Sequence, residues 1–200
     1  DYKREIECIK NLCHVSVDGI VLCPANSGTE YENYLLSLGI PIVTIGNRLT
    51  RIPYIGIDNS SAISEVVAAL LGKGYRKLVY VKPNLTQRNT FAQTERLNSF
   101  TFACEKAGVS FVVADMACAE KELSLNTPCA LVCPTDIYAI KLLRVAQKYG
   151  AGIIGFDNLR LIDDLELPLD SVSYDIDLTA QNAVDHIVNG VPITASIPYK

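Results

Sequence analysis

The stretch Gly152-Ile153-Ile154-Gly155-Phe156, followed by the polar pair Asp157-Asn158, decides the predicted fold of this chain. A continuous apolar run that ends abruptly in polar residues is typical of a strand buried on both faces of a parallel sheet. Residues 130–133 form a second such run, and residues 136–149 between the two have the spacing of a helix. Strand, helix and strand in this order form one unit of an α/β protein.

The same alternation extends over the rest of the chain. Strands are predicted at residues 17–23, 41–45, 54–57, 78–81, 111–114 and 171–174, with a final edge strand at 193–199. Helices are predicted at residues 4–14, 29–38, 93–107, 118–123 and 178–189, and another follows the capping residues 58–61 and ends at Gly72. Because these strands are too many for one small sheet, the sequence predicts an α/β chain with two parallel sheets, each covered by helices on both faces.

The charge of the chain argues against direct binding of nucleic acid by this segment. The formal net charge is -4, and the 18 Lys and Arg residues are scattered along the sequence. Nucleic-acid backbones are bound by clustered Lys and Arg. The longest uninterrupted apolar run, residues 66–71, is far shorter than the roughly 20 residues that span a membrane. We therefore expect neither DNA binding by this segment alone nor a membrane partner.

The 7 cysteines form a poor disulfide framework, because their number is odd and their spacing is loose. Most lie in apolar stretches, where free Cys is a common core residue. Cys129 and Cys133 have no second close pair that could complete a zinc site, and His14 and His186 are the only histidines. We expect free thiols in a reducing, cytoplasmic compartment, with no metal and no cofactor.

Motifs of catalysis are missing from the sequence. It contains no G-x-S-x-G elbow, no P-loop, no G-x-G-x-x-G after a strand and no H-E-x-x-H. Two histidines in helical stretches are a poor supply of general bases. We therefore expect a protein that is not an enzyme. A small α/β enzyme stays as a third possible function, after the two binding functions given below.

Polar side chains follow almost every predicted strand. In parallel α/β sheets, ligands bind beyond the carboxyl ends of the strands, where the chain turns into a helix. The residues at such positions are Asn26, Asp58, Thr135, Asp136, Asp157 and Tyr174, together with Arg96 on the helix behind the long loop at 82–92. An ionised Asp accepts two hydrogen bonds side by side and an Arg donates two in one plane, so the two can clamp vicinal hydroxyls. The sequence predicts a receptor for a small polar molecule.

Most of these residues also have a purely structural interpretation. Asp58 and Asp136 each precede a helix, as an N-cap does. Arg96 could be a surface residue that pairs with Glu95 or Glu105. Asn26 could only shape the turn before Gly28, and Tyr174 could pack through its ring. Asp157 is the hardest to explain in this way, because it ends a strongly apolar strand.

The chain resembles the effector-binding domain of the LacI/GalR family of bacterial transcription regulators, in segments that run in family order over nearly its whole length. The segments are Val17-Asp18-Gly19-Ile20-Val21-Leu22-Cys23-Pro24, Gly39-Ile40-Pro41-Ile42-Val43, Ile55-Gly56-Ile57-Asp58-Asn59, Gly74-Tyr75-Arg76-Lys77-Leu78, Glu95-Arg96-Leu97-Asn98-Ser99-Phe100, Pro134-Thr135-Asp136, Ile154-Gly155-Phe156-Asp157-Asn158 and Pro168-Leu169-Asp170-Ser171-Val172. Ser99 departs from the Gly that the family usually has there, and Thr135 replaces a common Asn.

The resemblance implies a periplasmic-binding-protein-like type I fold. Such a fold has two similar Rossmann-like lobes, joined by three crossover strands, with a ligand cleft between them. The lobes would comprise residues 1–70 plus 176–191 and residues 71–175 plus 192–200. On that template the first lobe is incomplete at its N-terminus, and the helix-turn-helix headpiece is missing.

The resemblance also implies which residues contact the effector. Arg96 matches the contacting Arg of the family, and Asp157 matches its contacting Asp. Asp58 matches another frequent contact position. Asn26, Thr135 and Tyr174 fall where relatives place polar contacts.

The function implied is the effector sensor of a transcription regulator. A sugar or sugar derivative, less readily a purine, would bind between the lobes. It would thereby control operator binding by the missing headpiece of a homodimer in the cytoplasm. The alternative is the solute-binding protein of a sugar importer, which uses the same fold without DNA.

Overall fold

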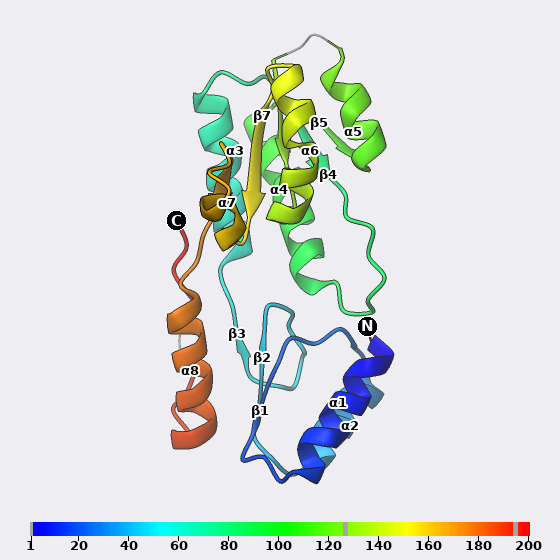
Figure 1. The fold of residues 1–200 in the computed structure, drawn as a ribbon, viewed down its shortest axis with the longest axis vertical. Helices are drawn as coiled ribbons and strands as arrows, with labels where there is room; N and C mark the ends of the chain where they lie inside the picture. Colours follow the sequence, from blue (N-terminus) through cyan, green and yellow to red (C-terminus); the bar gives the residue numbers. More distant parts are fainter. Residues whose placement is uncertain (1, 126–127, 194–195) are drawn as a thin grey trace. The chain divides into compact units, whose positions relative to one another are not determined.

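The chain folds as two compact units (Figure 1), and the computed structural model describes residues 2–125, 128–193 and 196–200. Unit 1 comprises Asp1–Asp58, Leu85–Ala92 and Asp175–Pro198. Unit 2 comprises Asn59–Asn84, Gln93–Tyr174 and Tyr199–Lys200.

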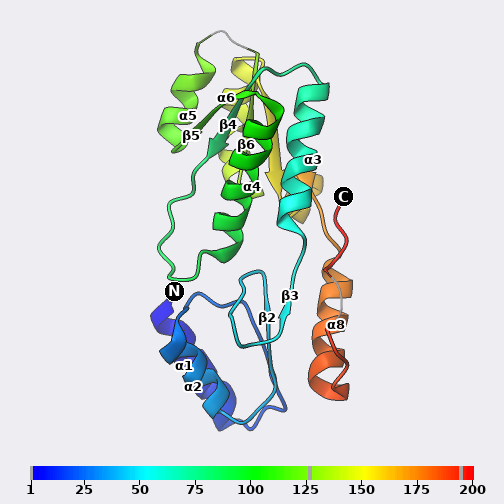
Figure 2. The same cartoon turned by 180° about the vertical axis from the view of Figure 1, so that it is seen from behind.

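Unit 1 is built on a parallel sheet with the strand order β1-β2-β3. Its elements are α1 (Tyr2–His14), β1 (Ile20–Leu22), α2 (Thr29–Ser37), β2 (Ile42–Ile45), β3 (Tyr54–Ile55) and α8 (Ile176–Asn189). In both Figure 1 and Figure 2, α1 and α2 lie on one side of the strands and α8 lies on the other.

The alternation of side chains along β1 explains how unit 1 is packed. Ile20 and Leu22 are buried in one cluster with Ile9 of α1 and Leu35 of α2. Val21, between them, points to the opposite face and is exposed. The sequence also fixes the ends of α8, because the Asp175 carboxylate accepts the N–H of Leu178 and Gly190 adopts a left-handed conformation after the last turn.

Unit 2 is built on a larger parallel sheet with the order β5-β4-β6-β7-β8. Its elements are α3 (Asn59–Gly72), β4 (Lys77–Val81), α4 (Phe91–Ala107), β5 (Ser110–Ala114), α5 (Met116–Leu123), β6 (Cys129–Val132), α6 (Asp136–Lys148), β7 (Gly152–Phe156), α7 (Arg160–Asp164) and β8 (Asp170–Val172). The helices α5 and α6 lie in front of this sheet in Figure 1, and α3 and α4 lie in front of it in Figure 2.

Both faces of the unit 2 sheet are buried, as the apolar strands predict. Val79 and Leu131 pack with Leu142 of α6 on one face. On the other face the Tyr80 ring lies 5.2 Å from the ring of Phe100 of α4, measured between centroids. The predicted α/β fold with two helix-covered parallel sheets is confirmed.

The structure departs from the predicted elements in several places. β1 begins at Ile20 instead of residue 17, and β3 ends at Ile55 instead of residue 57. A short helix, α7, was not predicted, and β8 ends at Val172 instead of residue 174. The predicted strand at 193–199 is wrong for the residues that can be described. They contribute only isolated bridges, from Ile197 to Ile57 and from Tyr199 to Tyr174. Pro198 lies between these two residues and has no N–H to donate to a ladder. Residues 194 and 195 lie outside the described residues.

The compact units differ from the expected lobes at α3, at residues 85–92 and at the described residues from 192 to 198, which belong to unit 1, and the lobe boundaries stay a prediction. Helix α3 lies in unit 2, where the Asn59 amide donates to Glu95 and Glu65 accepts from the Tyr199 hydroxyl. Residues 85–92 lie in unit 1, where the Asn89 N–H donates to the Ala25 carbonyl. Long-range hydrogen bonds of this kind leave no periodic signal in a sequence.

All 7 cysteines lie within the described residues as free thiols. Cys104, Cys129 and Cys133 are buried, and burial raises the pKa of each thiol, to about 12 for Cys104. Cys8, Cys23 and Cys118 are exposed. Among the described residues, no helix combines the length and apolar character that crossing a membrane requires.

Gly155 in β7 allows the strand to pass directly beside the Asp136 side chain. A Cβ at position 155 would overlap the Asp136 Oδ1 atom, and it would also press on the backbone of that residue. We therefore expect Gly155→Ala to lower the free energy of unfolding by about 1–3 kcal/mol, the usual cost of overpacking a buried site. Urea unfolding measures this difference.

Gly72→Ala is the matched control, because a Cβ there meets open space among the described atoms. That control should leave stability within about 0.5 kcal/mol of the parent chain. Equal stability of the two variants would show that the close approach at Gly155 is unimportant.

Candidate functional site

The two residues that the sequence singled out most strongly, Arg96 and Asp157, lie together in unit 2. Arg96 comes from α4, and Asp157 directly follows the carboxyl end of β7. The Arg96 Nη2 and the Asp157 Oδ1 are 3.6 Å apart, so the two side chains form an ion pair. This places a cation and a carboxylate at the edge of the sheet where ligands of parallel α/β proteins bind.

Arg96 is buried, with 7% of its surface exposed, and so is not the surface residue of the alternative interpretation. Its Nε donates to the Asn59 Oδ1 at 2.9 Å, and its Nη1 donates to the Pro134 carbonyl at 2.7 Å. The guanidinium carbon lies 3.5 Å from the centroid of the Phe156 ring, which adds a cation–π contact. A buried charge is tolerated only when it is paired and hydrogen-bonded, and these groups meet that condition.

The backbone at Asp157 has an unusual conformation. Its φ is +100°, and the φ of Asn158 is +47°, so two consecutive side-chain-bearing residues lie in the left-handed region. Such residues cost roughly 1–3 kcal/mol each and persist where the surrounding structure holds them. The Asp157 N–H donates to the Val172 carbonyl of β8 at 2.9 Å. Strain of this kind clusters at binding and catalytic sites, which supports the assignment of Asp157.

The pKa of the Asp157 carboxyl is raised to about 6, first because the group is desolvated by burial. The negative charge of Asp136 raises it further, and the positive charge of Arg96 opposes both effects. With 26% of the side chain exposed, the carboxyl can still reach a ligand from solvent. Its protonation should therefore respond to any charge or hydrogen bond that a ligand brings.

Thr135 and Tyr174 also belong to unit 2. Thr135 is the residue before α6, and its side chain makes no cap hydrogen bond within the described chain. It adjoins Pro134, whose carbonyl accepts from Arg96. Tyr174 is half-buried and pairs with Tyr199 through the backbone. Their predicted contacts with a ligand stay a prediction.

Asn26 and Asp58 belong to unit 1. Asn26 is buried, and its side-chain nitrogen donates to the Tyr2 carbonyl at 2.7 Å and to the Glu5 Oε1 at 2.9 Å. These bonds fix the loop after β1, so the amide nitrogen already has a structural task. Asp58 is exposed and directly precedes α3. For both residues the predicted contact with a ligand stays a prediction.

Two residues of the site were missed or misread from the sequence. Asn59 accepts from Arg96, although the sequence marked it as a polar residue after a strand and in a capping stretch and predicted no role in the site for it. Asp136 is not the N-cap of α6, because Thr135 holds that position. Its carboxylate instead accepts from the Ser171 hydroxyl and the Leu159 N–H. The position of Asp136 beyond a buried strand was the available signal for a role in the site.

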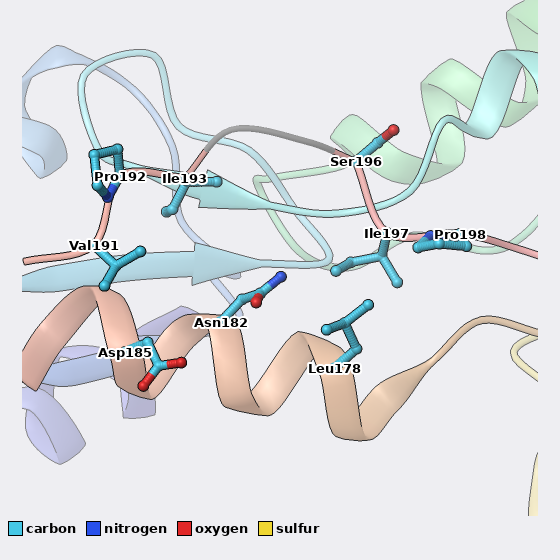
Figure 3. A pocket seen from close by; sticks show the side chains of 9 residues that line it. All are labelled: Leu178, Asn182, Asp185, Val191, Pro192, Ile193, Ser196, Ile197 and Pro198. Atoms are coloured by element: carbon cyan, nitrogen blue, oxygen red, sulfur yellow. The ribbon is translucent and has the colours of Figure 1, made fainter. Parts of the chain in front are cut away.

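A separate pocket of about 330 Å³ lies in unit 1 (Figure 3). Leu178, Asn182 and Asp185 of α8 line one side of it, and residues 191–193 and 196–198 line the other. None of the described residues that line it is among the six predicted contacts. The lining is largely apolar, and the pocket lacks the pairing of opposite charges found at Arg96 and Asp157.

Unit 1 and unit 2 are each built on a parallel sheet, and in unit 2 an ion pair lies at the carboxyl edge of the sheet. The chain belongs to the family of periplasmic binding protein-like domains, whose model matches residues 67–196. The predicted type I periplasmic-binding-protein-like fold is confirmed by this match and by the solved structures.

The curated relatives include regulators of transcription. Catabolite control protein A of Priestia megaterium is 25% identical over 217 residues, which cover 97% of this chain and 65% of that protein. The chain thus spans just under two thirds of the length of this relative. The predicted resemblance to the effector-binding domain of LacI/GalR regulators is confirmed over most of the chain.

Solved structures of two kinds share the fold. An ABC transporter solute binding protein from Burkholderia multivorans has a TM-score of 0.81 at 22% identity, covering 100% of this chain and 82% of that one. A periplasmic binding protein/LacI transcriptional regulator from Alkaliphilus metalliredigens, complexed with D-xylulofuranose, has a TM-score of 0.79 at 22% identity, with the same coverage. At these identities the likeness shows the fold alone. These proteins are regulators and binding proteins and not enzymes.

The raised pKa of Asp157 predicts a pH dependence of stability. The folded protein holds this proton up to about pH 6, whereas the unfolded chain releases it near pH 3.8. The folded state therefore binds more protons in this window, and its stability falls as pH rises from about 4 to 6. The difference between the two pKa values corresponds to at most about 3 kcal/mol.

Asp157→Asn removes this titration. Urea unfolding at several pH values should show the parent chain losing stability relative to Asp157→Asn between pH 4 and pH 6. Asp163→Asn, at an exposed position of α7, is the control and should follow the parent chain. Parallel stability curves for the parent and Asp157→Asn would contradict the burial of this carboxyl.

Proposed function

We propose that the chain is the effector-sensing domain of a bacterial transcription regulator, which binds a sugar or sugar derivative at Arg96 and Asp157. The observation that carries this proposal is the buried ion pair at the strand edge, on a backbone held in a strained conformation. An ion pair needed only for stability would not require the left-handed turn at Asp157, because an ordinary loop could supply a carboxylate.

The geometry of the pair suits a hydroxyl group. At 3.6 Å the Arg96 Nη2 and the Asp157 Oδ1 are too far apart for a good hydrogen bond to each other. A ligand hydroxyl can accept from the guanidinium and donate to the carboxylate at the same time. Hydrogen bonds with a charged partner contribute about 1.5–3 kcal/mol each, so three or four are enough for micromolar binding.

The charge of the site favours a neutral ligand over an anionic one. One guanidinium faces the carboxyl groups of Asp157 and Asp136, and the chain as a whole has a net charge of -4. A phosphate or carboxylate on the ligand would meet this negative potential, and among the described residues Arg96 is the cation that acts on both acids. Neutral sugars therefore fit better than sugar phosphates.

The regulatory part of the proposal rests on the relatives. Catabolite control protein A is longer than this chain, and the matched region covers 65% of it. In a regulator built in this way, the sensing domain would act on operator DNA through a headpiece and would work as a cytoplasmic homodimer. The ligand can change operator affinity by no more than its own difference in affinity for the two states of the domain.

A second candidate function is the solute-binding component of an importer, which the solute binding protein of Burkholderia multivorans supports at a TM-score of 0.81. Free cysteines, of which this chain has 7, are unusual in an oxidising compartment and favour the regulator. The sequence of the whole gene distinguishes the two. A helix-turn-helix segment ahead of this region would support the regulator, whereas a secretion leader would support the importer.

The ligand can be found by thermal-shift screening against neutral sugars, sugar phosphates and purines. A ligand at 100 times its dissociation constant adds about 2.7 kcal/mol of stability, which raises the melting temperature measurably. We expect the largest shift from a neutral sugar. If only purines or only sugar phosphates shift the transition, the proposed ligand class is wrong.

Substitutions at the ion pair test the site with the best ligand from that screen. Arg96→Ala and Asp157→Asn should each weaken binding about 10- to 150-fold in calorimetry, because each removes a charged hydrogen-bond partner of the ligand that contributes about 1.5–3 kcal/mol. Arg96→Lys keeps the positive charge but not the planar pair of N–H donors. It tests the same hydrogen bonds to the ligand if the alanine variant does not fold.

The matched controls are Arg144→Ala and Asp163→Asn, which change exposed residues of unit 2 in the same way. Both should bind like the parent chain. Parental affinity in folded Asp157→Asn would place the ligand elsewhere.

A further inference from the structure

The Asp136 carboxylate is fully buried at the start of α6, with 0% of the residue exposed. Its Oδ1 accepts from the Ser171 hydroxyl at 2.6 Å, and its Oδ2 accepts from the Leu159 N–H at 2.7 Å. Burial raises the pKa of Asp136, and these two bonds act in the opposite direction. Since burying an acid is costly, a residue placed here calls for an explanation beyond filling space.

Ser171 carries the network from Asp136 to the turn after β7. Its hydroxyl donates to Asp136, and its Oγ accepts from the Asn158 N–H at 3.0 Å. The Asp136 carboxylate therefore holds two consecutive backbone N–H groups: that of Asn158 through the Ser171 hydroxyl, and that of Leu159 directly. Both lie immediately after Asp157.

The held segment is the strained one. Asp157 and Asn158 have φ values of +100° and +47°. A turn with two such residues would relax to ordinary φ values if its amides were released. The conformation at Asp157 sets the direction of its side chain, and in the present conformation the carboxylate meets Arg96.

We infer that Asp136 is a positioning residue, which acts through Ser171 and the Leu159 N–H to hold the left-handed turn that aims the Asp157 carboxylate at Arg96. Asp136 does not itself contact the ligand. The importance of this arrangement for ligand recognition rests on the proposed function, but the positioning itself can be measured without any ligand.

The close approach of β7 supports this role over that of a helix cap. Gly155 has no side chain where a Cβ would overlap the Asp136 Oδ1. The carboxylate is therefore held against the strand that ends at Asp157, and the N-cap position of α6 belongs to Thr135. The charged groups that act on the Asp157 carboxyl are Arg96 of α4 and Asp136 of α6.

Ser171→Ala is the decisive variant, because it removes the hydroxyl that connects the Asn158 N–H to the Asp136 carboxylate and leaves the buried charge of Asp136 in place. Amide hydrogen exchange by NMR should become at least about tenfold faster at Asn158, whose N–H loses its acceptor, while Val79 in the interior strand β4 keeps its parental protection. The pKa of Asp157, measured by NMR titration of its carboxyl carbon, should fall from about 6 toward the ordinary value of 3.8, because a released side chain moves into solvent.

Ser171→Thr restores the hydroxyl and should return both measurements to near the parental values. Ser124→Ala is the matched control, because it removes a serine hydroxyl that donates to the nearby Lys121 carbonyl of α5 at 2.7 Å, away from the turn after β7. It should change neither measurement. If Ser171→Ala leaves the Asn158 exchange rate and the Asp157 pKa unchanged, the inference is overturned.

A merely structural role would give a different pattern. Loss of general stability would speed exchange at Val79 as much as at Asn158, and the pKa of Asp157 in the folded protein would stay near 6. That result would also overturn the inference. If instead positioning is lost in Ser171→Ala but no sugar binds the parent chain, the proposed function fails and the inference stands.

Discussion

A guanidinium that has lost almost all contact with water has to find its partners within the protein, and Arg96 is in that position. It draws one partner from each of several elements: the Asn59 side chain at the start of α3, the Pro134 carbonyl after β6, and the Phe156 ring and Asp157 carboxylate at the end of β7. Each of these groups is held in place by its contact with the same buried guanidinium. The ordered edge of the unit 2 sheet is therefore as much a consequence of Arg96 as of the strands.

The same constraint explains why the carboxylate opposite Arg96 is unusual. Asp157 is desolvated, lies near a second buried acid, and is attached to a left-handed backbone. Each of these features alone is unfavourable. The positive charge of Arg96 offsets part of the first two, and the hydrogen bonds that connect the turn to Asp136 and Ser171 hold the third. A ligand that enters such a site meets groups that are already oriented, so little of its binding energy is spent on ordering them.

Much of the fold could be predicted from the sequence, because buried strands and amphipathic helices leave local patterns. The strand at Gly152–Phe156 was located with its ends correct to one residue, and the polar residue after it was recognised as a site residue. Helix α7 escaped because five residues are too few to show helical spacing. The edge strand at the C-terminus was overestimated because apolar residues between prolines have the composition of a strand without its pairing.

The interior of the site was harder to foresee. Arg96 could be matched to a contact position, but nothing local shows that its partners are Asn59 and Pro134, which lie 37 and 38 residues away. Asp136 looked like a cap because caps and buried site acids occupy the same place, between a strand and a helix. Only the three-dimensional partners, Ser171 and Leu159, separate the two roles.

The distribution of thiols has a practical consequence for studying movement in this protein. The buried cysteines Cys104, Cys129 and Cys133 keep their protons at neutral pH and should resist alkylation. The exposed ones fall in both units, with Cys8 and Cys23 in unit 1 and Cys118 in unit 2. Each unit of the native chain thus carries at least one thiol that an alkylating reagent can reach. The labelling rate of each exposed cysteine would report on local changes in its own unit, without introducing a single new residue.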